Sequence, residues 1–431
     1  MWWGGGMNVN LPIGYRIEQL TPDRLRDVMV LDTWAFPHIT DIDEVKLEEL
    51  SLTWERTFGV VPPNGKPGEI VGMYGTHPFR QAAVPGATIS MGGLTWVSVH
   101  PQHRRKGLLN AMIDHHFTTC IDNGEPIAGL FAAEMAIYGR YGFGVAGDHV
   151  MLEIPRQAEL RPVTDSDKHT VRVEMCNPEA HEEMILHIHA AQGQPSCVGR
   201  PGWVTFETPG LRSSMLQDPS RWRGGKESRR IVIVERDGEP RGYALLRRGT
   251  SWSSYLPQGK VEVREALALD AAAEHALWKV LLDFDLMKVT DIDTQSVDAR
   301  ILNLLVNRRA ALPKLVDNQW IRIIDLPAAL TTRKYQADLD VVLDVTDERL
   351  PANAGNWRLQ ARAFGEATCV RTDSPAEVTL DVRELGSIYL GGRSLAALAT
   401  AGLANDGQVT DAVMRTSAAF GWPLAPAAME Y

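Results

Sequence analysis

One stretch near residue 100 restricts the fold of this 431-residue chain more than any other. Residues 87–99 are typical of a strand, Pro101 ends the run, and a basic loop leads to Gly107, where a helix over residues 107–123 begins. A strand followed by a helix is the unit from which mixed α/β sheets are built. The N-terminus of such a helix has unpaired N–H groups and the positive end of the helix dipole, which together can bind a pyrophosphate.

The loop itself strengthens the case for an anion site. Arg104, Arg105 and Lys106 add positive charge, and Gly107 lets the backbone approach a phosphate closely. The sequence is neither a GxxxxGK[ST] loop nor a GxGxxG loop, so neither of those nucleotide sites is predicted. A solvated basic turn at the start of a helix is the alternative interpretation of the same residues.

Two successive units of the chain repeat the order strand, strand, long strand, helix. The first unit is predicted to contain helices at 20–29, 41–52 and 107–123 and strands at 69–76 and 87–99. The second is predicted to contain strands at 230–236, 242–248 and 261–269 and a helix at 272–282. A polar, proline-containing stretch at 153–167 predicts a linker between them. This order indicates a weak internal repeat.

The second unit lacks the basic loop, because residues 268–272 (ALDAA) stand between its long strand and its helix. It is therefore expected not to bind phosphate and to serve as a scaffold. After Pro327 a third segment has strands predicted at 338–345 and 376–381 and helices at 387–401 and 406–420. We expect it to be a small α+β domain.

Composition excludes several classes of function. The net charge of −10 (44 basic against 54 acidic residues) disfavours a general nucleic-acid binder and suits cationic ligands. No apolar run approaches the roughly 20 residues that span a bilayer, and the first residues are not typical of a signal peptide. Four widely spaced cysteines predict free thiols, no metal site and a cytoplasmic location. Met7 offers a second start site, so residues 1–6 are excluded from the fold prediction.

Two motifs carry a resemblance to a known family. The chain has V-x-V in a strand, then a proline, and then R-R-x-G before a helix. This order resembles the acetyl-coenzyme A loop of GNAT N-acetyltransferases. Residues 134–144 (EMAIYGRYGFG) resemble the IYGRFGYG signature of the Eis (enhanced intracellular survival) family. The resemblance covers nearly the whole chain. It implies tandem GNAT domains with mixed, twisted sheets and flanking helices, followed by an α+β domain similar to sterol carrier proteins. The implied domains are 1–155 (active), 156–327 (degenerate) and 328–431.

The same resemblance implies acetyl-coenzyme A as the co-substrate, and no metal. Three groups of residues would contact it. The backbone along the pantetheine arm would be that of Val97, Ser98 and Val99. The pyrophosphate would be held by Arg105, Lys106, Gly107, Leu108, Leu109 and Asn110. The acyl end would lie beside Ala133 and Glu134.

The resemblance also implies the two proton-transfer groups. Tyr138 matches the family's general acid, with a packing tyrosine as the alternative, and the C-terminal carboxylate of Tyr431 would be the general base. A frayed tail is the usual fate of a terminus, but the apolar approach at residues 420–424 favours docking. The neighbouring Glu430 could hold a cationic substrate.

Other residues have weaker claims. Trp34, Phe36 and Trp54 could line the amine pocket, and core packing is the equal alternative. The acidic residues before the first long strand could steer a polyamine inward, although a solvated helix face explains such a run as well. They are Asp41, Asp43, Glu44, Glu48 and Glu49.

The implied function is acetyl transfer from acetyl-coenzyme A to amines of a cationic substrate. Members of the family acetylate aminoglycosides, often at more than one amine, and commonly assemble as hexamers, so a homohexamer is expected. A protein lysine or an arylalkylamine is an alternative substrate. A non-catalytic carrier of an apolar ligand is the alternative from another class, and the intact R-R-x-G loop disfavours it.

Overall fold

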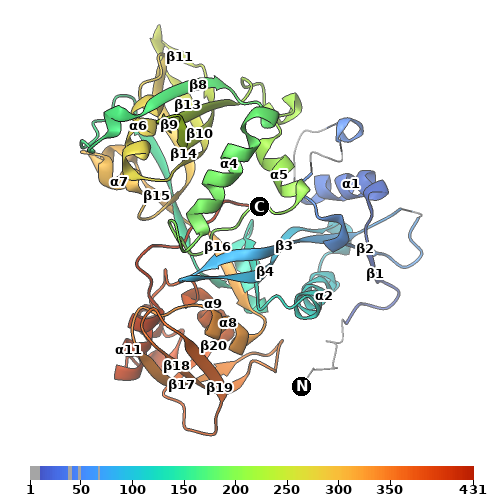
Figure 1. The fold of residues 1–431 in the computed structure, drawn as a ribbon. Helices are drawn as coiled ribbons and strands as arrows, with labels where there is room; N and C mark the ends of the chain where they lie inside the picture. Colours follow the sequence, from blue (N-terminus) through green and yellow to red (C-terminus); the bar gives the residue numbers. More distant parts are fainter. Residues whose placement is uncertain (1–9, 37–40, 47–49, 67) are drawn as a thin grey trace.

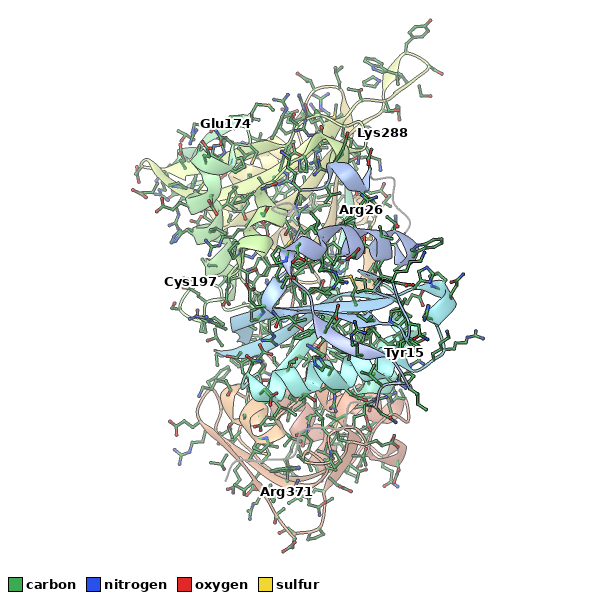
Figure 2. The ribbon with its side chains drawn as sticks, turned by 90° about the vertical axis from the view of Figure 1, so that its right-hand side faces the viewer. Tyr15, Arg26, Glu174, Cys197, Lys288 and Arg371 are labelled. Atoms are coloured by element: carbon green, nitrogen blue, oxygen red, sulfur yellow. The ribbon has the colours of Figure 1, made fainter. Side chains whose placement is uncertain are left out.

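The computed structural model describes residues 10–36, 41–46, 50–66 and 68–431. Figure 1 shows three parts stacked on one another, with the C-terminus in the middle of the molecule. Seen from the side in Figure 2, Glu174 lies in the upper part, Tyr15 in the middle part and Arg371 in the lower part. The middle part contains the strand, basic loop and helix near residue 100.

A seven-stranded sheet forms the middle part, and its order is β1-β2-β3-β4-β5-β16-β6. Its pairs are antiparallel except for β4 with β5. The strands are β1 (Arg16–Gln19), β2 (Thr57–Val61), β3 (Gly72–Val84), β4 (Ala87–Val99), β5 (Ile127–Phe131), β6 (Gly144–Val145) and β16 (Gln319–Ile323). Helix α1 (Leu25–Ala35) packs with Met73 and helix α2 (Leu108–Asp122) with Tyr74. Because successive residues of a strand point to opposite faces, the two helices cover opposite faces of this sheet.

A second seven-stranded sheet, with the order β15-β7-β14-β13-β10-β9-β8, forms the upper part. Its strands are β7 (Asp148–Pro155), β8 (Thr170–Met175), β9 (Arg230–Arg236), β10 (Glu239–Gly249), β13 (Gly259–Ala268), β14 (Met287–Ser296) and β15 (Lys314–Asp317). Its helices are α4 (Pro178–Gly193), α5 (Pro209–Leu216), α6 (Ala271–Leu281) and α7 (Arg300–Leu304), and a hairpin of β11 (Trp252–Ser253) and β12 (Leu256–Pro257) projects from it. Only β13 and β14 pair in parallel, as β4 and β5 do in the first sheet.

The two sheets exchange strands. Strand β7 follows directly on the first sheet's β6 in the chain, yet it pairs with β14 and β15 of the second sheet. Strand β16 follows the second sheet's β15, yet it lies between β5 and β6 of the first. The predicted boundary at residues 155 and 156 therefore does not separate the strands of the two sheets. The backbone hydrogen bonds of each sheet depend on a strand from the other half of the chain.

The lower part is a four-stranded sheet, β19-β18-β17-β20, covered by helices. Its strands are β17 (Leu339–Thr346), β18 (Gly355–Ala361), β19 (Ala367–Arg371) and β20 (Val378–Asp381), and its helices α8 (Leu326–Thr332), α9 (Val382–Ile388), α10 (Leu395–Thr400) and α11 (Asp411–Phe420). Helix α9 lies directly on the first sheet: a Cβ on Gly386 would stand 2.3 Å from the Ile321 carbonyl oxygen of β16. Only a glycine allows this approach.

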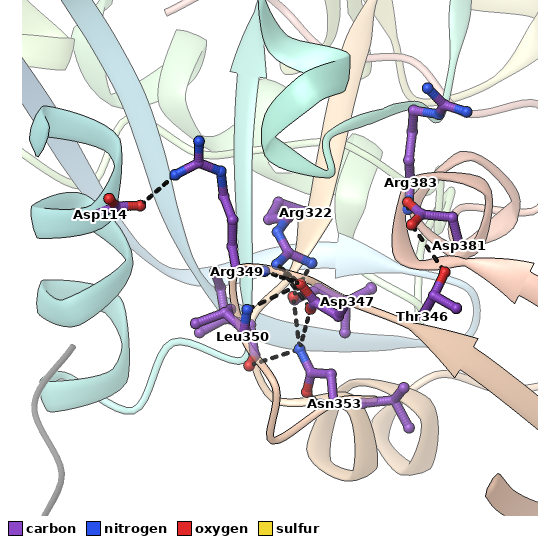
Figure 3. Close-up of polar contacts among 12 residues, drawn as sticks. Asp114, Arg322, Thr346, Asp347, Arg349, Leu350, Asn353, Asp381 and Arg383 are labelled. Carbon is purple, nitrogen blue, oxygen red and sulfur yellow. Dashed lines mark hydrogen bonds and ion pairs between the residues drawn. The ribbon is translucent and has the colours of Figure 1, made fainter. Parts of the chain in front are cut away.

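A buried ion pair joins the lower part to the first sheet (Figure 3). The guanidinium of Arg322 on β16 donates to both carboxylate oxygens of Asp347, at 2.7 and 2.8 Å, and both side chains are almost fully buried. Asn353 donates to the same carboxylate at 3.1 Å. Nearby, Arg349 pairs with Asp114 of α2 at 2.6 Å. The lower part thus contacts both the exchanged strand and the helix that follows the basic loop.

Several predicted elements differ from the structure. Within the described residues the predicted helix at 41–52 is reduced to one 3₁₀ turn, Ile42–Glu44, and residues 47–49 lie outside the description. Val45, Leu50 and Leu52 are all buried near α1, and in a helix Leu50 would face a different side from the other two. The helix prediction was wrong because Val45, Leu50 and Leu52 are all buried in one cluster with α1, which a single helical face could not achieve.

Two further predictions were wrong in their extent. The helix predicted at 387–401 is two helices, α9 and α10, because Gly391 takes a positive φ of 82° and Ser394 caps the second helix at the Ala397 N–H. The linker predicted at 153–167 begins inside β7, which extends to Pro155. The prolines and charges of that stretch therefore include the end of an inner strand as well as a loop. Among the described residues, no helix is long and apolar enough to cross a membrane.

Replacing Asp347 with alanine is expected to lower the free energy of unfolding by about 3–5 kcal/mol, because it leaves the Arg322 guanidinium buried without its carboxylate. Urea unfolding of the full chain measures this change. Asp340→Ala is the matched control, since Asp340 pairs with Arg358 in a largely exposed position and should change the stability little. Equal effects of the two substitutions would contradict a stabilising role for the buried pair.

Candidate active site

The site forms where β4 and β5 separate. The parallel pairing joins only Met91–Gly93 of β4 to Ile127–Gly129 of β5. Beyond these residues β4 continues to Val99 and β5 to Phe131 without pairing to each other. Opposite Tyr74, strand β4 has an extra residue, and Trp96 takes a positive φ of 53° in this bulge. Beyond the paired region lies a cavity of about 330 Å³. Its lining includes Leu94, Thr95, Trp96, Val97, Phe131, Ala132, Ala133 and Tyr138.

The N-terminus of α2 follows the end of β4 and is open to solvent. Gly107 caps the helix with a positive φ of 83°, and no described atom lies within 4 Å of the place where its Cβ would stand. Arg104, Arg105 and Lys106 are exposed beside it. The unpaired N–H groups of the first turn and three cations therefore face the same solvent region, where an anion can bind.

The corresponding turn of the second sheet is closed. Asp270 caps α6 by accepting the Ala273 N–H at 2.9 Å, and Arg241 donates to the same carboxylate. A carboxylate already occupies the place where a phosphate would bind, and its charge would repel one. This agrees with a scaffold role for the second sheet, and it shows the physical contrast between the two helix starts.

Tyr138 ends the short helix α3 (Met135–Tyr138) and lines the cavity. Burial raises the pKa of its phenol to about 12, with smaller contributions from Tyr141 and Glu134. The phenol is therefore protonated at neutral pH. Tyr141 donates from its hydroxyl to Asn110 Oδ1 at 2.8 Å and thereby ties this segment to the first turn of α2.

The C-terminal Tyr431 enters the same cavity, and two glycines make room for its ring. Gly93 and Gly129 are direct partners across β4 and β5. A Cβ on Gly129 would lie 3.0 Å from the Tyr431 hydroxyl, and one on Gly93 would lie 2.8 Å from the ring. Phe79 and Phe131 flank the ring with centroids at 4.8 and 4.9 Å. The terminal ring therefore lies over a paired position of β4 and β5 at which neither strand has a side chain.

The terminal backbone lies beside β4, and the charges around it are acidic. Thr95 donates from its hydroxyl to the backbone oxygen of Tyr431 at 3.3 Å. Among the described residues that line the cavity, the charged side chains are Asp317 and Glu430. Asp317 is held by the indole N–H of Trp320 at 2.7 Å. Such a lining favours a cationic group.

The remaining predicted residues lie in several places, and Trp54 packs against the buried cluster that includes residues of α1. Phe36 lines the cavity, whereas Trp34 is 58% exposed and packs against His100 outside it. Ser98 and Val99 continue β4 beyond the cavity, and Glu134 is exposed next to Ala133. Of the acidic run, Asp41 and Glu44 are exposed, Glu48 and Glu49 lie outside the described residues, and the side chain of Asp43 is not described either.

Sequence reasoning missed Thr95, Asp317, Asn318 and the glycine pair. Thr95 lies inside the strand predicted at 87–99, two residues before Val97, and could have been found from that position. Asn318 lies more than a hundred residues before the end of the chain that it contacts, so no local pattern points to it. Within the described residues, no group of three or more His, Cys, Asp or Glu side chains is placed to hold a metal ion.

Comparisons with known proteins agree with this architecture. The acetyltransferase (GNAT) domain family matches residues 16–146, a second acetyltransferase (GNAT) family matches 211–323, and the sterol carrier protein domain family matches 326–429. The chain is 36% identical over 359 residues to an uncharacterized N-acetyltransferase of Streptomyces avermitilis, which covers 83% of this chain and 85% of that protein. It is 32% identical over 351 residues to N-acetyltransferase Eis of Mycobacterium bovis, covering 79% and 81%.

Solved structures show the same fold over the whole chain. Eis1 of Mycobacterium abscessus matches with a TM-score of 0.78 at 24% identity, covering 97% of this chain and all of that one. A GCN5-related N-acetyltransferase of Anabaena variabilis matches with the same TM-score at 18% identity and the same coverage.

Proposed function

Because the chain belongs to the Eis family of GNAT N-acetyltransferases, we propose that it transfers the acetyl group of acetyl-coenzyme A to an amine of a cationic substrate. The predicted fold class, two GNAT domains followed by a sterol-carrier-protein-like domain, is confirmed by the family matches. Two features at the unpaired end of β4 carry the proposal. The cavity with acidic lining lies beside residues 94–97 of this strand, and the open, basic N-terminus of α2 follows the strand's end.

The residues present fit acetyl-coenzyme A. Beyond Gly93 the edge of β4 is not paired with β5, so the backbone of Val97, Ser98 and Val99 is available for an extended arm. The first turn of α2, from Arg105 to Asn110, would hold the pyrophosphate. Ala133 and Glu134 would lie beside the acyl end. When bound, acetyl-coenzyme A supplies an acetyl group activated as a thioester.

Two groups of the cavity are proposed to move the protons. The attacking amine must give up a proton, and the carboxylate of Tyr431 is the proposed acceptor. The rings of Phe79 and Phe131 pack against the Tyr431 ring and hold this residue in the cavity, and the Thr95 hydroxyl donates to its backbone oxygen. The departing sulfur needs a proton, and the protonated phenol of Tyr138 is the proposed donor. Glu430 and Asp317 would hold the substrate's positive charge.

A second cavity beside Glu430 has a balanced lining of acidic and basic groups, so a substrate with several amines is proposed on the family resemblance and not on this cavity. Its volume is about 570 Å³, and Asp291, Asp293 and Glu262 are its further acidic groups. Basic side chains line the same cavity, namely Lys226, Arg229, Arg247 and Arg264. Aminoglycosides, acetylated at several amines, are the proposed substrates, with a protein lysine or an arylalkylamine as alternatives. A cytoplasmic homohexamer is the proposed form, on the family resemblance.

Thiol release from acetyl-coenzyme A tests the function directly. A panel of aminoglycosides, polyamines, lysine peptides and arylalkylamines is offered to the full chain, and the products are weighed by mass spectrometry. We expect turnover with aminoglycosides and more than one added acetyl group. If acetyl-coenzyme A binds but no aminoglycoside is acetylated, the result contradicts this substrate class. No binding of acetyl-coenzyme A would favour the carrier alternative.

Tyr138→Phe is expected to lower kcat by about 10²–10⁴-fold, because the departing sulfur loses its proton donor. Binding of acetyl-coenzyme A, measured by calorimetry, should change little. Since burial raises the pKa of Tyr138 to about 12, the wild-type enzyme should keep this acid as the pH rises to about 11 and lose it only above that. Tyr389→Phe, in a buried tyrosine of the lower part, is the control. A wild-type rate for Tyr138→Phe would assign Tyr138 to packing.

Removing Glu430 and Tyr431 should abolish turnover, because the proposed base is lost, while acetyl-coenzyme A still binds. A gentler change adds one glycine after Tyr431. It keeps the aromatic ring and moves the free carboxylate by up to about 3.8 Å, so kcat should fall by roughly 10²-fold. One glycine added before Met1 is the control. Unchanged kcat in both C-terminal variants would overturn the terminal carboxylate as the base.

A further inference from the structure

The two sheets open in the same way. In the second sheet, β13 and β14 pair in parallel from Gly259–Val263 with Met287–Ile292 and then separate, although β13 continues to Ala268 and β14 to Ser296. The first sheet separates at the corresponding point, beyond Gly93 and Gly129. The opening of the first sheet contains the active cavity. The opening of the second sheet also contains a segment of the chain.

The C-terminal segment lies in this second opening. Only about 80 Å³ of space remains there, and it is lined by Glu265–Ala268 of β13, by Thr294–Ser296 of β14 and by Ala427–Met429. Ala427 and Ala428 are 4% and 1% exposed. The segment is thus as buried as a core strand.

The backbone of the segment is hydrogen-bonded at Ala425, Ala427 and Ala428. Asp298 accepts the Ala425 N–H at 2.9 Å, and Arg200 donates to the Ala425 carbonyl at 2.6 Å. Pro426 has no N–H to satisfy, and its ring packs so closely on Gly392 that a Cβ there would lie 2.5 Å away. The Ala427 N–H donates to the Pro201 carbonyl at 3.1 Å.

Asn318 holds the next residue from both sides. Its Oδ1 accepts the Ala428 N–H at 2.9 Å, and its Nδ2 donates to the Ala428 carbonyl at 3.1 Å. Asn318 is almost fully buried and stands between β15 and β16, where the chain crosses from the second sheet to the first. A single side-chain amide thus pairs with the segment as a neighbouring strand would.

We propose that the opened strands of the degenerate domain are a binding groove for an extended peptide, and that the chain's own segment 425–429 is its ligand. Asp270 closes the helix start beside the groove, so a phosphate-bearing ligand is excluded and a backbone is accepted. The groove delivers Tyr431 into the active cavity of the other sheet. Asn318 is a positioning residue in this arrangement. Its effect on turnover rests on the proposed role of the terminal carboxylate.

Hydrogen exchange in the full chain tests the groove without using activity. In the wild type, the amides of Ala427 and Ala428 should be protected. Asn318→Ala removes two hydrogen bonds from the segment, so exchange at Ala428 should rise by roughly 30-fold. Arg200→Ala loosens the segment from its other end and should raise exchange as well. Asn356→Ala is the matched control, because that amide bonds a loop carbonyl far from the groove, in the lower part.

Turnover and cofactor binding are measured on the same variants. Faster exchange together with a kcat lowered by about 10²-fold and an unchanged Kd for acetyl-coenzyme A supports the groove and the base. Faster exchange with unchanged kcat supports the groove and overturns the terminal carboxylate as the base. Two results would overturn the proposed groove. In one, the Ala428 amide of the wild type exchanges as fast as in an unstructured peptide. In the other, this amide stays protected in both groove variants.

Discussion

The early end of the parallel pairing between β4 and β5 is the constraint on which the site depends. Three residue pairs join the strands, and beyond Gly93 and Gly129 the strands separate while β3 still holds β4 in place. The separation leaves a free backbone edge on β4 and a cavity beside it. The terminal tyrosine fits because the last paired position has hydrogen in place of two side chains.

The two halves of the chain show how one framework can take two different ligands. Each has a pair of parallel strands that separates, and each has a helix that follows the first strand of the pair. The helix starts differ in charge and in capping residue: three cations and Gly107 leave the first turn of α2 open, whereas Asp270 closes that of α6 with its carboxylate. In the first half the opening is left as a cavity, and in the second it is filled by Ala427 and Ala428.

Much of this arrangement could be predicted from the sequence because it is local. The strand at residues 230–236 has the predicted bounds, and the strand, basic loop and helix near residue 100 are where the pattern put them. Tyr138, Phe36 and Tyr431 converge on one cavity. The exchanged strands and Asn318 could not be predicted, because their partners lie more than a hundred residues away. The helix expected at 41–52 failed because periodicity in a short amphipathic run says nothing about which separate side chains a neighbouring helix will bury.

The exchange of β7 and β16 has a consequence for the order of folding. Strand β5 ends at Phe131, but its neighbour β16 begins only at Gln319, so the first sheet stays incomplete through most of synthesis. Loop closure over that distance is slow and leaves an unpaired strand edge exposed in the meantime. The nascent chain must therefore keep β5 from pairing with other chains until the second sheet exists. A protein built in this way benefits from chaperones that shield strand edges, and its yield should depend on the speed of translation more than that of domains that fold one after another.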